Sequence, residues 1–348
     1  MTRLSKLKTY WPFNHDGETK AQSRPVTAVV FGSGGARGWA HIGVLKAFRE
    51  IGFKPDIVAG TSIGSIAAAV YAADALDRFL AFSENMDWFK ATQLFVEFGV
   101  HRGGLIEGRK VSDFIDEMIQ VENIEDLPIP YAAVATNLET SAEVVFTKGS
   151  LIQAIRSSIS IPGVFTPVHL GGKYLVDGGL VNPLPINVVR EMGATHIVAI
   201  NINNNLKCPS GPSASLVRPG NLSESFREHF IRFHWGDEQA AKVAKSSSTI
   251  NPAALVGGVT ELVKKLPVKR RPVKEANVRN LNLFDVFTRS LRIAEDVITK
   301  ECIRLNPPAV LIEPAVGDIA TMDFSRATDA IEAGYQATLA ILGPGAGR

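Results

Sequence analysis

Residues 26–64 read VTAVVFGSGGARGWAHIGVLKAFREIGFKPDIVAGTSIG. The apolar run at 26–31 predicts a buried strand, because it is short, rich in β-branched residues and followed by glycine. Apolar residues then recur at helical spacing until Gly52, the expected C-cap. A second short strand at 55–59 leads into GTSIG and an alanine-rich helix. This alternation predicts parallel βαβ units with right-handed crossovers.

The rest of the sequence continues the alternation, except in one long segment. Helices are predicted near 75–90, 107–120, 150–159, 184–192, 283–304 and 325–341, and strands near 130–136, 143–147, 173–176, 196–202 and 309–313. Residues 205–280 break the pattern with six prolines, and hold 13 Lys and Arg against 6 Asp and Glu. A structureless loop of this length is uncommon in a compact domain, so we interpret the segment as a basic lid or surface subdomain.

The predicted organisation therefore has four parts. A flexible arm at 1–24 precedes an α/β core at 25–204. The basic insertion at 205–280 follows, either a lid or a membrane-facing segment. A C-terminal helix–strand–helix unit at 281–348 then completes the core.

The composition is that of a globular protein with no overall attraction to nucleic acid. Its 348 residues include 37 Lys and Arg against 35 Asp and Glu, a net charge of +2. Cys208 and Cys302 are too far apart for a CxxC metal or redox site. The longest apolar run, 66–73, is shorter than the ~18 residues of a membrane span, and residues 1–25 lack the apolar region of a signal peptide. We therefore expect a cytoplasmic protein.

The motif Gly60-Thr61-Ser62-Ile63-Gly64 places a serine between a predicted strand and a predicted helix. In a GxSxG turn, the two glycines permit a sharp bend that forces the serine into a strained, exposed position. Backbone N–H groups at the start of the helix can stabilise a developing negative charge. Ser62 is therefore a candidate nucleophile, although an ordinary glycine-lined βα turn has the same spacing.

A second glycine-rich turn, Gly32-Ser33-Gly34-Gly35-Ala36-Arg37-Gly38, lies between the first strand and its helix. Consecutive glycines allow several N–H groups to converge on a phosphate or an oxyanion. A dinucleotide site is disfavoured, because Arg37 replaces the third glycine of that fingerprint and Val58 stands where a ribose-binding acid is expected. No Gly-Lys-Ser/Thr follows, which excludes a P-loop. We interpret the turn as an oxyanion hole, with Arg37 as a fixed cation beside it.

The third motif, Asp177-Gly178-Gly179, follows a short predicted strand and by itself indicates only a turn. Its interest is that a serine nucleophile needs a base. The histidines that come after it are His196, His229 and His234, and none lies in a recognisable histidine loop. A pair of Ser62 and Asp177 therefore competes with a Ser-His-Asp triad.

Together, the three motifs resemble the patatin-like phospholipase family. GSGGARG at 32–38, GTSIG at 60–64 and DGG at 177–179 occur in the family's order. The similarity extends to WAHIGVL at 39–45 and RSSISIPGVF at 156–165. Three ordered motifs with these flanks are far more specific than any one of them.

The resemblance covers about 26–202 and is expected to resume at 283–341. It implies an α/β fold with three layers, α/β/α, around a mostly parallel central sheet, and a long irregular insertion outside it. It implies a serine lipid acyl hydrolase that cleaves carboxylic esters of phospholipids, lysophospholipids or related lipids through an acyl-enzyme, with no cofactor and no metal.

The resemblance also assigns roles to residues. Ser62 and Asp177 form a catalytic dyad, and backbone N–H groups of Gly34 and Gly35 form the oxyanion hole with Arg37 nearby. The supporting motif residues are Gly32, Gly38, Gly60, Gly64, Gly178 and Gly179. Ser33 departs from the pattern, because the family's glycine motif often has glycine there.

Two alternatives stay open at this point. The first is a non-catalytic regulatory or scaffold protein with the same fold, and the second is a Ser-His-Asp esterase. The expected partner is a lipid or membrane surface and not a nucleic acid. Peripheral membrane contact through 205–280 is one interpretation of LVKKLPVKRRP at 262–272, which mixes apolar and basic residues. A solvated loop is the other.

Overall fold

The computed structural model describes residues 24–84, 98–101, 104–204, 283–344 and 346. The predicted insertion at 205–280 and the predicted arm at 1–24, apart from Arg24, lie outside these residues. The described residues up to 204 and from Phe287 onward belong to one compact unit. No helix in the described part of the chain is both long and apolar enough to cross a membrane.

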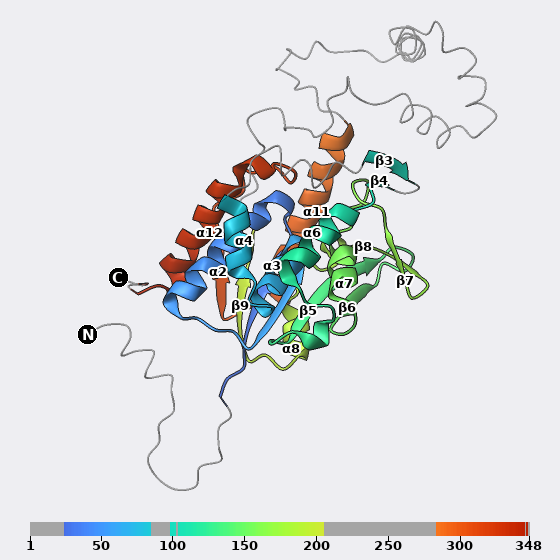
Figure 1. Ribbon diagram of the computed structural model, residues 1–348. Helices are drawn as coiled ribbons and strands as arrows, with labels where there is room; N and C mark the ends of the chain where they lie inside the picture. Colours follow the sequence, from blue (N-terminus) through green and yellow to red (C-terminus); the bar gives the residue numbers. More distant parts are fainter. Residues whose placement is uncertain (1–23, 85–97, 102–103, 205–282, 345, 347–348) are drawn as a thin grey trace, which may run out of the picture. The chain divides into compact units, whose positions relative to one another are not determined.

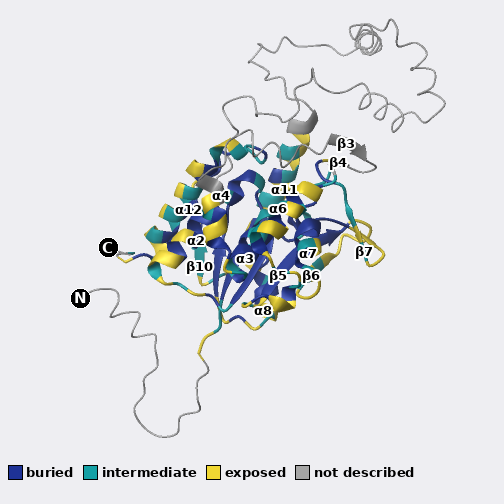
Figure 2. Cartoon of the chain, viewed as in Figure 1, coloured by how far each residue is buried: buried dark blue, intermediate teal, exposed yellow. Residues whose placement is uncertain are grey.

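A mostly parallel sheet of eight strands is the centre of this unit (Figure 1). Five neighbouring strands run parallel, and in spatial order they are β10 (Val310–Ile312), β9 (His196–Ile200), β1 (Thr27–Phe31), β2 (Ile57–Thr61) and β5 (Tyr131–Asn137). The antiparallel strands are β8 (Lys173–Asp177), β7 (Val168–Leu170) and β6 (Glu143–Phe146). The parallel strands β1, β2 and β5 are buried along nearly their whole length, which explains their continuous apolar runs (Figure 2).

One face of the sheet packs against two helices. Alternate residues of a strand point to the same face, and Ala28 and Val30 of β1 share a buried cluster with their counterparts on β2, β5 and β9. Apolar residues of α8 (Ile186–Glu191) and Ile303 of α11 (Leu283–Leu305) cover this cluster. These two helices form the first outer layer.

The opposite face packs against α2 (Trp39–Ile51) and α3 (Ile63–Ala72). The ring of Phe31 meets that of His41 on α2 edge-on, with centroids 5.3 Å apart. Tyr131 Oη donates a hydrogen bond to Ser65 O on α3 over 3.1 Å. The chain therefore forms three layers, α/β/α, as the resemblance implies (Figure 1).

The remaining elements extend these layers. The helices are α4 (Leu76–Glu84), α6 (Arg109–Ile119), α7 (Leu151–Ser158) and α12 (Ala327–Leu342), and the 3-10 turns are η2 (Gly35–Gly38), η3 (Ile124–Asp126), η4 (Gly178–Leu180) and η6 (Phe324–Arg326). Gly52 ends α2 in the left-handed conformation that its C-cap role predicts. The short strand β7 and the hairpin of β3 (Phe98–His101) with β4 (Gly104–Ile106) were not predicted, because neither shows a clear two-residue alternation.

The register of β5 brings the ends of β2 and β8 together. Thr61, at the end of β2, pairs with Val134, and Asp177, at the end of β8, pairs with the next residue, Ala135. Strand β6 pairs with both of these β5 residues and therefore occupies the opposite edge. Strands β2 and β8 thus meet end to end along one edge of β5, which places Ser62 beside Asp177.

Candidate active site

Ser62 occupies the turn between β2 and α3 in a strained backbone conformation, with φ 56° and ψ −128°. The Ser62 N–H donates to Ser158 Oγ over 2.8 Å, and Ser65 Oγ donates to Ser62 O over 2.6 Å. The strain predicted from GTSIG is therefore present. The predicted exposure is not, since Ser62 is only 3% exposed. The elements packed around the turn cover the serine, and sequence spacing does not report such packing.

The two glycines of GTSIG allow the backbone to pack closely around this serine. A Cβ on Gly64 would overlap Phe31 O on β1, and a Cβ on Gly60 would overlap Gly64 O. In the second turn, a Cβ on Gly38 would overlap the side chain of Ile63. The glycines thus let β1, β2 and α3 approach one another at the site.

Asp177 lies at the end of β8, and its carboxylate faces the serine. Ser62 Oγ donates to Asp177 Oδ2 over 2.5 Å, a short distance typical of a hydroxyl bound to a carboxylate. The N–H of Gly179 donates to Asp177 Oδ1 over 2.8 Å, and Thr136 Oγ1 donates to Asp177 O over 2.8 Å. The structure therefore brings together the two residues expected to form the dyad.

Burial raises the pKa of the Asp177 carboxyl to about 7, and the negative charge of Glu295 adds to the rise. The hydrogen bonds from Ser62 and Gly179 act in the opposite direction, because they stabilise the carboxylate. A general base works best when its pKa lies near the working pH. Asp177 therefore has the proton affinity that a base needs at neutral pH.

The predicted oxyanion loop runs beside the serine. Gly35 lines the same pocket as Ser62, and its φ of 59° and close approach to Thr321 O leave no room for a side chain. Ala36 N–H donates to Thr321 O over 2.8 Å, which holds the loop in place. Among the described residues, the N–H groups of Gly34 and Gly35 have no hydrogen-bond acceptor.

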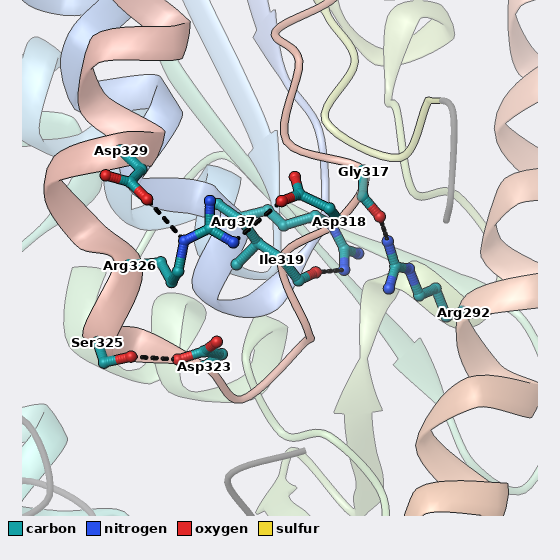
Figure 3. Close-up of polar contacts among 9 residues, drawn as sticks. All are labelled: Arg37, Arg292, Gly317, Asp318, Ile319, Asp323, Ser325, Arg326 and Asp329. Atoms are coloured by element: carbon teal, nitrogen blue, oxygen red, sulfur yellow. Dashed lines mark hydrogen bonds and ion pairs between the residues drawn. The ribbon is translucent and has the colours of Figure 1, made fainter. Parts of the chain in front are cut away.

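The guanidinium of Arg37 is fully buried and binds three acceptors beneath the loop. Its Nε donates to Ile202 O over 3.1 Å, and one terminal nitrogen donates to Asn203 Oδ1 over 2.7 Å. The other terminal nitrogen donates to Ile319 O over 3.4 Å (Figure 3). Burial lowers the Arg37 pKa to about 9, so the group remains protonated at neutral pH. The structure thus places the expected fixed cation in contacts that hold the loop against its neighbours.

A pocket at this end of the sheet contains the dyad. Its polar lining includes Ser33, Ser62, Asp177, Arg292 and Glu295. Its apolar lining includes Ile161, Pro162, Leu180 and Leu291. The pocket therefore combines charged and apolar residues around the dyad.

Sequence reasoning missed the two charged residues that α11 contributes. Arg292 donates to Gly317 O over 2.5 Å (Figure 3), and Glu295 accepts from Ser33 Oγ over 3.1 Å. Both lie on one helical face with Leu291 and Ile298, but the sequence carries no signal that this face points into the pocket.

Of the three histidines considered as triad members, His196 lies within the described residues, and it is far from the dyad. His196 is exposed and begins β9, at the amino ends of the parallel strands, whereas Ser62 follows the carboxyl end of β2. His41 is buried, and its Nε2 donates to Gly32 O over 2.8 Å. Residues 229 and 234 lie outside the described part of the chain. Within that part, no histidine contacts the Asp177 carboxylate.

Comparison with known proteins gives consistent matches. Residues 29–190 match the family model of patatin-like phospholipases. An uncharacterized NTE family protein of Mycobacterium tuberculosis is 30% identical over 333 residues, which cover 90% of this chain and 91% of that protein. Neuropathy target esterase sws of Drosophila melanogaster is 35% identical over 183 residues, and patatin-like phospholipase domain-containing protein 6 of Homo sapiens is 36% identical over 184 residues. Each of these two matches covers 51% of this chain and 13% of the longer relative.

Proposed function

The chain belongs to the patatin-like phospholipase family, and from this membership we propose that it is a serine lipid acyl hydrolase with a Ser62–Asp177 dyad. It cleaves carboxylic esters of phospholipids, lysophospholipids or related lipids through an acyl-enzyme. The observation that carries the proposal is the 2.5 Å hydrogen bond from Ser62 Oγ to Asp177 Oδ2 inside the pocket. The relatives named for esterase or phospholipase activity support the same reaction class.

Acylation begins when Ser62 Oγ attacks the ester carbonyl carbon while its proton passes to Asp177 Oδ2. The carbonyl π electrons move onto oxygen, which becomes the oxyanion of a tetrahedral intermediate. When the intermediate collapses, the bond to the alcohol oxygen breaks, and the departing alkoxide takes the proton from Asp177. The products of this half-reaction are the free alcohol and an acyl ester on Ser62.

Deacylation repeats these steps with water as the nucleophile. Asp177 accepts one proton from water as the water oxygen attacks the acyl carbonyl. Collapse of the second intermediate breaks the bond to Ser62 Oγ, which takes the proton back from Asp177. A carboxylic acid leaves, and both residues return to their starting states.

The oxyanion is stabilised by the backbone N–H groups of Gly34 and Gly35. Both lack an acceptor within the described part of the chain, and Gly35 lines the pocket with Ser62. One such donor is worth about 3 kcal/mol of transition-state stabilisation. The apolar residues Ile161, Pro162 and Leu291 line the pocket beside the dyad and would contact the acyl group next to the ester carbonyl.

The test combines active-site labelling with ester turnover. A fluorophosphonate probe should label Ser62, and Ser62→Ala should abolish labelling. Asp177→Asn should lower kcat/KM for a short soluble ester by about 10²- to 10⁴-fold, because it removes the general base. His196→Ala is the matched control and should keep wild-type turnover. An unlabelled, folded wild type would favour the scaffold alternative, and a His196→Ala variant as inactive as Asp177→Asn would favour the triad.

A further inference from the structure

Glu295 places a second carboxylate in the pocket, and the mechanism described so far does not use it. It comes from α11, more than a hundred residues after Asp177 in the sequence. Ser33 Oγ donates to Glu295 Oε1 over 3.1 Å. The hydroxyl that binds Glu295 belongs to Ser33, which precedes Gly34 and Gly35 in the predicted oxyanion loop.

The position of Gly179 shows how closely the two carboxylates approach. A Cβ built on Gly179 would overlap Glu295 Oε1, and would lie 2.9 Å from Ser33 Oγ and 3.1 Å from Asp177 Oδ1. Three polar oxygens therefore converge on the space beside one glycine. Glu295 and Asp177 both border this space, and a larger residue at 179 would separate them.

Other charged groups compensate Glu295 only in part. Arg37 on η2 and Arg292 on α11 act on it as cations, and Ser33 and Asn203 hydrogen-bond to it. Burial nevertheless raises its pKa. Asp177 lies near Glu295, and Glu295 is the main charged group that shifts the pKa of Asp177.

We propose, on the basis of the proposed hydrolase function, that Glu295 is a positioning residue that fixes the oxyanion loop through Ser33 and places a negative charge beside Asp177. The charge makes loss of a proton from Asp177 less favourable, so the base holds a proton more strongly. The hydrogen bond to Ser33 joins α11 to the turn that contains Gly34 and Gly35. The base strength of Asp177 and the position of the oxyanion loop thus both depend on the Glu295 side chain.

The decisive experiment is the pH profile of kcat/KM for a soluble ester in Glu295→Gln. The amide keeps the size and the acceptor oxygen but removes the charge, so the acid limb should move to lower pH by about one unit. Because Asp177 is then a weaker base, kcat at the plateau should fall while KM changes little. Glu295→Asp keeps the charge and should keep the acid limb near its wild-type pH.

Glu301→Gln is the matched control, because it removes one negative charge from an exposed site on the same helix. Its acid limb should coincide with that of the wild type. A Glu295→Gln profile that also coincides with the wild type would overturn the proposal, and so would a Glu295→Asp profile shifted as far as that of Glu295→Gln.

A second readout does not depend on hydrolysis. At pH 8, Asp177→Asn should raise Tm more in the wild-type background than in the Glu295→Gln background. In the wild type the substitution removes the repulsion between Asp177 and Glu295, whereas in Glu295→Gln that repulsion is already absent. At pH 4.5, where the Asp177 carboxyl holds its proton, this difference should disappear. Additive Tm changes at pH 8 would overturn the proposal. Absence of labelling and turnover in the wild type would instead overturn the proposed function, and the Tm comparison would then decide the role of Glu295.

Discussion

The backbone at Ser62 is strained, and the surrounding contacts hold it in that state. The residue has a positive φ, while Ser158 and Ser65 bind its N–H and C=O groups. Neighbouring glycines let the strands and α3 pack closely enough to form those contacts. The strain at the serine is therefore compensated by packing at positions that have no side chain.

This argument predicts that Gly64→Ala is far more damaging than Gly52→Ala. The Gly64 Cβ would overlap Phe31 O, so we expect a loss of about 3 kcal/mol or more in the free energy of unfolding. Gly52 has open space around it and only a positive φ of 68°, so its substitution should cost about 1 kcal/mol. Urea unfolding of both variants measures the difference. Equal losses would contradict the packing explanation.

The pKa of Asp177 also predicts how stability depends on pH. In the unfolded chain an aspartate has a pKa of about 3.9, whereas folding raises it to about 7. Between these values the folded protein binds more protons than the unfolded chain, so the free energy of unfolding falls as pH rises. Below pH 4 this loss is absent, and above pH 7 it is complete, at about 4 kcal/mol.

Asp177→Asn has no such titration. Its stability relative to the wild type should therefore increase from pH 4 to pH 7 and then level off. Guanidinium unfolding at pH 4.5, 6 and 8 measures this trend. Parallel stability curves for the two proteins would show that Asp177 titrates normally.

The sequence predicted that Ser62 and Asp177 would pair, because each lies in a short motif at the end of a strand and the three ordered motifs resemble one family. The structure places the two side chains in hydrogen-bonding contact. The positive φ of Ser62 agrees with the sharp turn that GTSIG predicts. The burial of Ser62 could not be predicted, because it depends on residues from other elements that pack around the turn.

At the scale of elements, the oxyanion loop is held by C-terminal segments that lie far from it in the sequence. Arg37 binds Ile319 O, Ala36 binds Thr321 O and Ser33 binds Glu295. The loop preceding α12 is bound from a second side by Arg292 (Figure 3). The elements after residue 283 therefore stabilise the catalytic loop as well as extending the sheet.

Arg37→Met should consequently reduce the free energy of unfolding by about 3 to 5 kcal/mol, because it leaves three buried acceptors without their donor and removes one of the two cations near Glu295. Arg326→Met is the comparison, since Arg326 binds Asp318 and Asp329 near the surface and should cost about 1 kcal/mol or less. Thermal and chemical unfolding of both variants provides the test. A cost for Arg37→Met as small as that for Arg326→Met would show that its buried contacts contribute little.

The orientation of α11 illustrates what the sequence leaves open. Most of its apolar residues lie on one side of the helix, and Ile293 and Val297 on that side are 65% and 61% exposed. An apolar stripe would predict that these residues face the core. The structure instead turns Arg292 and Glu295 inward, because a buried loop and a pocket offer them charged and hydrogen-bonding partners. Periodicity alone does not contain that information.

At the scale of the whole chain, the charge distribution gives a prediction about membranes. Lys264, Lys265, Lys269, Arg270 and Arg271 lie in the basic segment that sequence analysis identified. Each basic residue near an anionic surface contributes about 1 kcal/mol, so changing all five to Gln should weaken binding to anionic vesicles at least about tenfold. Hydrolysis of a short soluble ester should not change.

Vesicle flotation measures this binding, with neutral phosphatidylcholine vesicles as the lipid control. The matched protein control changes five exposed lysines of the core to Gln: Lys46, Lys54, Lys110, Lys148 and Lys173. Equal loss of binding in the two variants would mean that net charge, and not the segment, governs the interaction.

The edge of β5 shared by β2 and β8 has a consequence for how this fold can vary. Ser62 and Asp177 are 115 residues apart in the sequence, yet their separation in space is set by two adjacent pairings, Thr61 with Val134 and Ala135 with Asp177. The lengths of the segments that connect these strands do not affect the distance between Ser62 and Asp177. Loops between these strands that do not contact Ser62 or Asp177 can therefore lengthen, shorten or be exchanged without moving the reacting atoms. Relatives could diversify their substrates by such exchanges while inheriting the same chemistry.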